Sequence, residues 1–397
     1  MEDIYIVSGV RTPVGDFGGS LKSFLPADLG TLVATEAIQR SGVAPVDVGH
    51  VIVGQVMPTS ARDEMLSRVI ALKSGIPAEV PALTLNRLCG SGVEAIVSAA
   101  RLMQLGEADI TLAGGAESMS NVPYHDHGVR WGKKMGANTQ EDALTLGLSD
   151  AIGGYHMGVT AENVAERHQV GREEMDALSV TSHQRAARAI AEGRFKDQIL
   201  PVEIKTRKGT ATFDTDEHVK GDTSIEVLAG MRAAFKKDGS ITAGNASGIN
   251  DGAAMVVLAT GAEVEKRGLE PFARIVAWGH AGVEPEYMGE GPIRAVPVAL
   301  KRAGLTLEQI DVIESNEAFA AQACAVSRAL GFDPEKTNPN GSGISIGHPV
   351  GATGTMLTVK CMYELQRTGK RYGLITMCIG GGQGIAMVIE NVKGAAA

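Results

Sequence analysis

Apolar runs rich in β-branched residues alternate with segments of helical periodicity through the first 120 residues. This alternation is typical of layered α/β domains. The runs that we expect to form strands are residues 4–7, 51–56, 82–85 and 110–113. The segments with an apolar stripe, which we expect to form helices, are residues 27–40, 66–73 and 92–105. The first part of the chain is therefore predicted to build a sheet with helices packed on it.

The alternation stops between residue 121 and about residue 250. This stretch is rich in glycine, charge and isolated aromatic residues, and only scattered helical segments such as 173–192 occur in it. A strand-like run at 253–259 and a short helical segment at 261–268 follow, and Pro271 then opens a second alternating part. We interpret residues 121–250 as a subdomain inserted into a layered core.

The parts of the chain before and after this insertion resemble each other. A turn leads into a strand at 51–54 in the first part and at 312–315 in the second. Each part then runs through a turn, a helix and a strand that ends in glycines. The turns carry Cys89 in the first part and His348 in the second. The pattern predicts a duplication, in which Cys89 and His348 occupy equivalent strand-to-helix turns and meet at the centre.

Composition narrows the class of protein. The 397 residues, 44% of them hydrophobic, are enough for two or three domains. A formal charge of −9 provides no basic face for phosphates, so nucleic acid is not an expected partner. No apolar run approaches the ~18 residues of a membrane span. The acidic start does not resemble a signal peptide, so we expect a cytoplasmic protein with no membrane association.

The cysteines indicate thiol chemistry rather than cross-links or metal binding. Cys89, Cys324, Cys361 and Cys378 are far apart and form no C-x-x-C pair. Neither a disulfide framework nor a zinc site is therefore expected, and no metal is predicted. We expect free thiols.

Cys89 stands in the sequence Asn86-Arg-Leu-Cys-Gly-Ser-Gly92, directly before a predicted helix. Unpaired backbone N–H groups and the positive end of the helix dipole favour a thiolate at such a position. The glycines let an acyl group approach, so the Cys89 amide could donate to an oxyanion. A buried cysteine that only fills space is the plainer alternative.

His348 lies at another predicted helix start, between glycines and a proline. A helix N-terminus disfavours the imidazolium, which suits a base that is neutral at rest. A histidine that merely caps a turn is an equal alternative. The nearby Gly341-x-Gly343 is not a dinucleotide-binding fingerprint, because it follows an Asn-Pro turn instead of a strand.

Two further residues lie at strand ends, where α/β folds build their sites. Cys378 ends a predicted buried strand and leads into a glycine turn, although a core cysteine is an alternative. Asn316 follows the strand 312–315 and could hold a water or orient the base, although a simple Asx turn is an alternative.

These motifs together resemble the signature set of the thiolase family. The matching segments are Asn86-x-x-Cys89-x-Ser91-Gly92, Gly114-Gly-Ala-Glu-Ser-Met-Ser120, Asn316-Glu-Ala-Phe319, Gly347-His-Pro-x-Gly351 and Cys378-x-Gly-Gly-Gly382. They follow one another in register from about residue 4 to residue 390. The chain most resembles the bacterial biosynthetic β-ketothiolases of the acetoacetyl-CoA type.

The resemblance implies an α/β fold of five layers, αβαβα, built from two duplicated halves. The N-terminal half would span residues 1–268 and include an inserted coenzyme A-binding loop domain at about 120–249. The C-terminal half would span residues 271–394. A homotetramer is also implied.

By resemblance, Cys89 accepts the acyl group, His348 activates Cys89, and Cys378 moves a proton at the α-carbon. Asn316, through a water, and His348 would form one oxyanion site. The amides of Cys89 and Gly380 would form a second.

The resemblance also implies a set of coenzyme A contacts. The residues are Leu148, His156, Met157, Lys220, Ala243, Ser247, Met288, Ala318 and Phe319. Lys220 and Val227 depart from the arginine and serine that relatives carry, which affects only the adenosine contacts.

The implied activity is acetyl-CoA C-acetyltransferase: reversible Claisen condensation of acetyl-CoA with acetyl-CoA or another acyl-CoA. Transfer of the acyl group to a cysteine divides the reaction into two steps, which predicts ping-pong kinetics. Acyl-CoA thioesters are the only expected small-molecule partners, and no separate cofactor is required. The product would enter fatty acid metabolism or polyhydroxyalkanoate synthesis. The alternatives are a degradative 3-ketoacyl-CoA or 3-oxoadipyl-CoA thiolase and a non-catalytic acyl-CoA or lipid carrier.

Overall fold

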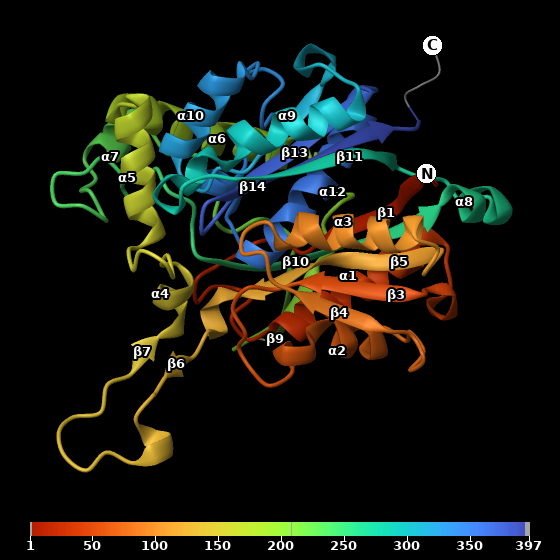
Figure 1. The fold of residues 1–397 in the computed structure, drawn as a ribbon, viewed down its shortest axis with the longest axis horizontal. Coiled ribbons are helices and arrows are strands. Elements are labelled where there is room, and N and C mark those ends of the chain that lie inside the picture. The colour runs from red at the N-terminus through yellow and green to blue at the C-terminus, as the bar shows by residue number, and fades with distance from the viewer. Residues whose placement is uncertain (1, 208, 394–397) are drawn as a thin grey trace.

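A ten-stranded sheet forms the centre of the computed structural model, which describes residues 2–207 and 209–393 (Figure 1). Its strand order is β12-β13-β14-β11-β1-β10-β5-β3-β4, with β2 paired to β10. The strands are β1 Ile4–Arg11, β2 Gly15–Asp16, β3 His50–Gly54, β4 Ala82–Leu85, β5 Ile110–Ser118, β10 Asn250–Thr260, β11 Ala273–Gly282, β12 Val312–Ser315, β13 Tyr372–Ile379 and β14 Gln383–Asn391.

The strand order repeats within this sheet. In the first half, β3 runs parallel to β4 and β5, and β10 runs antiparallel to β5 and β1. In the second half, β12 runs parallel to β13, and β14 runs antiparallel to β13 and β11. A parallel bridge between Ile313 and Thr337 takes the place of the β3–β4 pairing. The halves join where Ile4–Ile6 of β1 pairs with Ala273–Ile275 of β11. The predicted duplication is confirmed by this topology.

Helices complete five layers around the two halves of the sheet (Figure 1). Helices α3 (Ser91–Gln104) and α12 (Val350–Thr368) lie between the halves and share one apolar core with both. Helices α1 (Pro26–Ser41) and α2 (Leu66–Lys73) cover the outer face of the first half. Helices α9 (Gly291–Ala303) and α10 (Ala320–Leu330) cover the outer face of the second. The αβαβα arrangement agrees with the expected fold.

The two central helices touch at their N-terminal ends through glycines. A Cβ atom on Gly92 of α3 would lie 2.6 Å from the Thr355 nitrogen of α12. A Cβ atom on Gly354 of α12 would lie 2.5 Å from the Val93 nitrogen of α3. The Thr355 hydroxyl also donates to the Gly92 carbonyl at 3.1 Å. Because side chains cannot intervene, the segments that precede the two helices are brought together.

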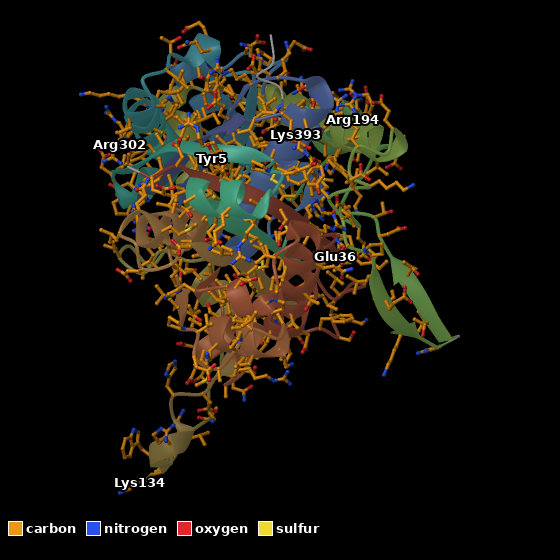
Figure 2. All side chains as sticks on the ribbon, turned by 90° about the vertical axis from the view of Figure 1, so that its right-hand side faces the viewer. Tyr5, Glu36, Lys134, Arg194, Arg302 and Lys393 are labelled. Atoms are coloured by element: carbon orange, nitrogen blue, oxygen red, sulfur yellow. The ribbon has the colours of Figure 1, made fainter. Side chains whose placement is uncertain are left out.

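The insertion between β5 and β10 carries several helices and two hairpins. They are α4 Ala143–Gly147, α5 Met157–His168, α6 Arg172–Ala191, α7 Ile225–Ala229, β6 Tyr124–His125 with β7 Glu141–Asp142, and β8 Val202–Thr206 with β9 Gly209–Phe213. A fully buried, bidentate ion pair at 2.7 and 2.9 Å joins Arg11 of β1 to Asp216 of the insertion. The arm between β6 and β7 projects away from the rest of the molecule, with Lys134 at its tip (Figures 1 and 2).

Some predicted elements differ from the observed ones. The run 51–56 leaves the sheet after Gly54, because the Val56 and Met57 amides donate to the Glu117 carboxylate. The strand predicted at 110–113 continues to Ser118, because Gly114 and Gly115 still pair with β10. Helix α11 (Gly343–Ile346) precedes His348, so His348 does not directly follow a strand. The third strand of the second half shrinks to the Thr337 bridge, since Pro339 has no N–H to extend a ladder.

The remaining helix of the core is α8 (Gly261–Arg267), which follows β10. Within residues 2–207 and 209–393, none of the helices has the length and apolarity that crossing a bilayer demands.

Candidate active site

The turn that carries Cys89 is shaped by its neighbours. The Asn86 Oδ1 atom accepts the Leu88 amide at 2.9 Å, and Leu88 adopts a left-handed conformation with φ of 46°. The Ser91 hydroxyl accepts the Arg87 amide at 2.9 Å and donates to the Leu88 carbonyl at 2.6 Å. The non-glycine positive φ stores strain that these hydrogen bonds hold in place. The turn presents Cys89 ahead of α3, as the sequence predicts.

The Cys89 and Cys378 thiols are electrostatic neighbours, although they come from different halves. The backbone amides of Cys89 and Gly380 lower the pKa of the Cys89 thiol. Burial raises the pKa of the Cys378 thiol, and the nearby Cys89 raises it further. Cys378 is the penultimate residue of β13 and is fully buried, whereas Cys89 is half-buried. The structure therefore brings together both thiols and the Gly380 amide.

Burial and the local amides act in opposite directions on the ionisation of Cys89. Burial raises the pKa of the Cys89 thiol to about 11, and the Gly380 and Cys89 amides only partly oppose this increase. Helix α3 begins at Ser91, after the cysteine, and the local amides lower the pKa, as the sequence predicts, by less than burial raises it. Cys89 therefore rests as a thiol, and a base must remove its proton.

His348 has the properties of such a base. Its Nδ1 atom lies 2.7 Å from the Thr353 hydroxyl, which itself donates to the Pro349 carbonyl at 2.8 Å. Because that hydroxyl proton is already engaged, Nδ1 carries the imidazole proton and Nε2 keeps its lone pair as an acceptor. Burial lowers the pKa of His348 to about 4, so the imidazole is neutral at neutral pH. Burial, rather than the helix N-terminus, is the cause.

Asn316 lies beside this imidazole, with its Nδ2 atom 3.4 Å from Nε2 of His348. Its side chain is fully buried, and among the described residues its Oδ1 atom has no hydrogen-bond partner. Asn338 fixes the preceding residue: its Oδ1 accepts the Ser315 amide at 2.9 Å, and its Nδ2 donates to the Ser315 carbonyl at 2.8 Å. The Asn338 side chain thus holds the backbone of the segment that carries Asn316.

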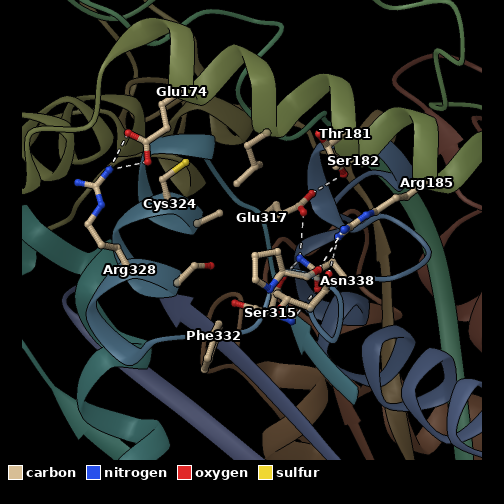
Figure 3. Close-up of a pocket in the computed structure, with 15 residues that line it drawn as sticks. Glu174, Thr181, Ser182, Arg185, Ser315, Glu317, Cys324, Arg328, Phe332 and Asn338 are labelled. Atoms are coloured by element: carbon tan, nitrogen blue, oxygen red, sulfur yellow. Dashed lines mark hydrogen bonds and ion pairs between the residues drawn. The ribbon is translucent and has the colours of Figure 1, made fainter. Parts of the chain in front are cut away.

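A cavity of about 410 Å³ lies behind this segment, lined by Ser315 and Glu317 (Figure 3). The Glu317 carboxylate accepts the Ser182 hydroxyl at 2.6 Å and the Asn338 amide at 2.9 Å, and burial raises the pKa of Glu317. At the rim, Arg328 pairs with Glu174 at 2.6 Å. Glu317 is thus held by Ser182 and Asn338, and Arg328 is held by Glu174. We infer that the polar side chains of this cavity support the segment that carries Asn316.

A second cavity, of about 390 Å³, contains Cys89 and His348 and is lined mainly by apolar side chains. The predicted coenzyme A contacts that line it are Leu148, His156, Met157, Ala243, Ser247, Met288, Ala318 and Phe319. Lys220 is outside this lining: it is exposed, with its Nζ atom 3.6 Å from the Asp16 carboxylate. The structure gathers the other predicted contacts around the reactive groups.

Ala246 and Gly248, which also line the cavity, belong to the segment 243–248 that the resemblance marks as a coenzyme A contact. The lining residues that were not predicted from the sequence are Met119, His218, Ala234, Phe235, Ile249 and Val350. The Phe235 ring stacks on His156 at 4.7 Å and meets Phe319 edge-on at 6.1 Å. Phe235 could have been noticed, since the chain has only eight phenylalanines and this one lies in a polar stretch. The apolar wall formed by these rings suits an uncharged chain such as a pantetheine arm.

The arrangement can perform acyl transfer. A neutral imidazole can take a thiol proton, the thiol can attack a carbonyl, and amide donors can stabilise the resulting oxyanion. A second thiol beside the first can exchange a proton with a carbon next to that carbonyl. Among the described residues, no cluster of three or more His, Cys, Asp or Glu side chains is placed to hold a metal ion.

Comparison with known proteins identifies the family. Residues 4–262 match the thiolase N-terminal domain, and residues 269–391 match the thiolase C-terminal domain. The chain is 55% identical over 391 residues to β-ketothiolase BktB of Cupriavidus necator, covering 98% of this chain and 99% of that protein. It is 44% identical to the mitochondrial 3-ketoacyl-CoA thiolase of Bos taurus, covering 98% and 99%.

Solved structures agree with this assignment. The fold matches the Bacillus anthracis acetyl-CoA acetyltransferase with a TM-score of 0.97 and 44% identity, covering 99% of both chains. It matches human mitochondrial 3-ketoacyl-CoA thiolase with a TM-score of 0.97 and 44% identity, covering 98% of this chain and 99% of that one. The chain belongs to the thiolase family and is an acyltransferase.

Proposed function

We propose that the chain is an acetyl-CoA C-acetyltransferase, which reversibly condenses acetyl-CoA with acetyl-CoA or another acyl-CoA. The observation that carries this proposal is the meeting of a neutral imidazole, two thiols and the Gly380 amide beside one apolar cavity. The similarity to a β-ketothiolase and to acetyl-CoA acetyltransferases supports the substrate class.

The reaction is reversible: thiolysis begins at Cys89, and condensation runs through the same steps in reverse. His348 Nε2 takes the Cys89 proton, and the sulfur attacks the 3-keto carbonyl of a 3-ketoacyl-CoA. The amides of Cys89 and Gly380 bind the oxyanion that forms. The C2–C3 bond then breaks, which leaves an acyl group on Cys89 and releases the enolate of acetyl-CoA.

Cys378 completes the first product. Its thiol delivers a proton to C2 of the enolate, while Asn316, through a water, and protonated His348 stabilise the enolate oxygen. An incoming coenzyme A thiol restores the Cys378 proton and attacks the acyl–Cys89 thioester. Cys89 leaves and recovers its proton from His348. The raised pKa of Cys378 suits a group that must hold a proton until an enolate forms.

Substrate binding follows from the cavity lining. His156, Phe235 and Phe319 form an aromatic wall along which the pantetheine arm can lie. The His156 Nδ1 atom accepts the Gly158 amide at 3.0 Å, so Nε2–H is free to donate to the ligand. Lys220, exposed near the same side of the insertion, provides a positive charge for a phosphate of the nucleotide end.

A degradative role is the second candidate function. The similarity to 3-ketoacyl-CoA thiolases of Bos taurus and human mitochondria favours it, and the same residues would serve. A 3-oxoadipyl-CoA thiolase is a variant of that role. Thiolysis rates for acetoacetyl-, 3-ketovaleryl- and 3-ketohexanoyl-CoA separate these activities, because a biosynthetic enzyme should favour the shortest substrates. A non-catalytic acyl-CoA or lipid carrier would release no coenzyme A from acetyl-CoA.

The proposal also covers the location of the enzyme, its assembly and the pathway that uses its product. We place the enzyme in the cytoplasm as a homotetramer, supplying 3-ketoacyl-CoA for polyhydroxyalkanoate synthesis or fatty acid metabolism. We also place the N-terminal half at residues 1–268 and the C-terminal half at residues 271–394, of which residue 394 lies outside the described residues.

The role of Cys89 is tested by mass spectrometry after incubation with acetyl-CoA. The wild-type protein should gain one acetyl group, and a Cys89→Ser variant should gain none, because a serine hydroxyl is far less nucleophilic. Cys378→Ser should still be acetylated but should lose exchange of α-protons in D₂O by about 100-fold or more. Cys324→Ala is the control and should behave as the wild type. Acetylation of Cys89→Ser at the wild-type level would remove the proposed mechanism.

A further inference from the structure

Glu117 is a buried carboxylate to which neither the mechanism nor the resemblance gives a role. It lies near the end of β5 and is fully buried. Its carboxylate accepts the amides of Val56 at 3.0 Å, Met57 at 3.1 Å and Gly351 at 2.8 Å. Val56 and Met57 follow β3 in the first half, whereas Gly351 lies in the first turn of α12 in the second. One side chain therefore connects the two halves of the molecule.

These contacts continue to the nucleophile on one side. The Val56 carbonyl accepts the Asn86 Nδ2 group at 3.1 Å, and the Asn86 Oδ1 atom accepts the Leu88 amide at 2.9 Å. Leu88 immediately precedes Cys89 and is the residue of this turn that has the strained, positive φ. The position of the Cys89 sulfur thus depends on the loop that Glu117 holds.

The contacts continue to the base on the other side. Gly351 is three residues from His348, and the same helical turn includes Thr353, whose hydroxyl orients the imidazole. A Cβ atom on Gly351 would lie 2.6 Å from the Glu117 Oε2 atom and 2.9 Å from the Gln55 Cα atom. The close approach of α12 to Glu117 therefore requires glycine at position 351.

We propose that Glu117 is a positioning residue that sets the placement of the His348 imidazole relative to the Cys89 sulfur. The inference rests on the proposed function, since it acts through those two groups. A carboxylate suits this task because it offers several lone pairs to three N–H donors that point inward from separate segments. A glutamine of the same size would direct an NH₂ group at one of those donors.

Glu117 also acts electrostatically on the nucleophile. Its negative charge raises the pKa of Cys89. Burial raises the pKa of Glu117, and the three amides oppose this increase because they favour the charged carboxylate. Removing that charge should therefore lower the pKa of Cys89, a signature that a purely structural carboxylate would lack.

The test compares Glu117→Gln with the wild type, and rates are normalised to the number of sites that form acyl-enzyme. We expect kcat for acetoacetyl-CoA thiolysis to fall about tenfold or more, because small misplacements of reacting groups are costly. KM should change by less than about twofold, since the cavity lining does not include Glu117. The alkylation rate of Cys89 by iodoacetamide should rise at a lower pH than in the wild type, because the charge that raises the Cys89 pKa is gone.

Asp311→Asn is the matched control. The Asp311 carboxylate accepts the amides of Arg371 and Tyr372 at 3.0 Å each, on a segment away from the reactive groups. Its kcat, KM and alkylation profile should equal those of the wild type. A normalised kcat for Glu117→Gln within about twofold of the wild type would overturn the inference.

A second variant covers the case in which Glu117→Gln does not fold. Gly351→Ala crowds the same carboxylate from the other side, and it should show the same fall in kcat with KM retained. A normal kcat in this variant would equally overturn the inference. If the wild-type protein itself formed no acyl-enzyme, the proposed function would fail instead, so the two failures are distinguishable.

Discussion

Loss of hydration sets the ionisation of the two groups that react first. Burial raises the pKa of Cys89 to about 11 and lowers that of His348 to about 4. At neutral pH the pair therefore rests as a thiol and a neutral imidazole. Both groups are uncharged until a substrate arrives, which fits a mechanism in which the base removes the thiol proton as the carbonyl is attacked.

At low pH, the acetylation rate of Cys89 should depend on the ionisation of His348. Because its pKa is lowered from 6.5 to about 4, the imidazole remains a base well below pH 6.5 and is lost only as the pH falls through about 4. The acetylation rate of Cys89, measured by rapid mixing after a pH jump, should therefore show no inflection between pH 6 and 7. An inflection there would mean that the imidazole has an ordinary pKa.

The lowered pKa of His348 also makes the free energy of unfolding depend on pH. The folded state binds the His348 proton less tightly than the unfolded chain does, so protonation favours unfolding. This residue's contribution is constant above pH 6.5 and is lost progressively as the pH falls from 6.5 toward about 4. The rapid measurement above avoids this effect because it precedes unfolding.

The sequence located the reactive residues and the neutral state of His348, but not the raised pKa of Cys89. A motif such as Cys89-Gly-Ser-Gly92 reveals a turn before a helix, which is a local property. Burial is produced by residues far along the chain, and it raises the pKa of Cys89 by more than the local amides lower it. Phe235 and Glu117 were missed for the same reason, since their roles arise from contacts with distant segments.

Elements with a strong local pattern were predicted closely. The strand at 82–85 and the helix at 66–73 match β4 (Ala82–Leu85) and α2 (Leu66–Lys73). Their alternation and apolar stripes are complete within one segment. The strand predicted before His348 does not form, and a single β-bridge at Thr337 takes its place. That outcome depends on pairing with β12, which no local pattern specifies.

The crossing of α3 and α12 should be sensitive to one methyl group. A Gly92→Ala change would place Cβ 2.6 Å from the Thr355 nitrogen and 2.9 Å from its hydroxyl oxygen. Overpacking of this kind typically costs about 1–3 kcal/mol. We expect a fall in the free energy of unfolding in that range, measured by urea denaturation, together with reduced activity.

The matched change for this experiment is Gly230→Ala. Gly230 has φ of −74°, and the nearest atom to a Cβ on it would be the Val227 carbonyl oxygen at 3.6 Å, an ordinary contact. Its effect on the free energy of unfolding should stay below about 0.5 kcal/mol. Equal stability of the two variants would contradict the assigned role of Gly92.

The projecting arm between β6 and β7 bears on the proposed tetramer. Trp131 is 87% exposed and Met135 is 88% exposed, and the arm projects beyond the body of the molecule (Figures 1 and 2). Large apolar side chains grouped on such a projection are typical of a contact surface between proteins. This exposure supports self-association through the arm.

A Trp131→Glu variant should therefore have a lower molar mass in solution than the wild type, because a charge would disfavour an apolar contact. Light scattering coupled to size-exclusion chromatography measures the difference. Leu105→Glu is the control: Leu105 is 75% exposed, lies away from the arm at the end of α3, and should leave the molar mass unchanged. An unaltered mass for Trp131→Glu would exclude the arm as the assembly surface.

Local chemistry and periodicity were enough to reveal the alternating elements, the duplication, the family motifs and the reactive residues, since each of these is written in neighbouring positions. Long-range packing established the rest. It joined Cys89 to His348 through the Gly92–Gly354 crossing, raised the pKa of Cys89 and enclosed the apolar cavity. Hydration, contact and distance are properties of the folded chain, because they depend on which segments exclude water from one another.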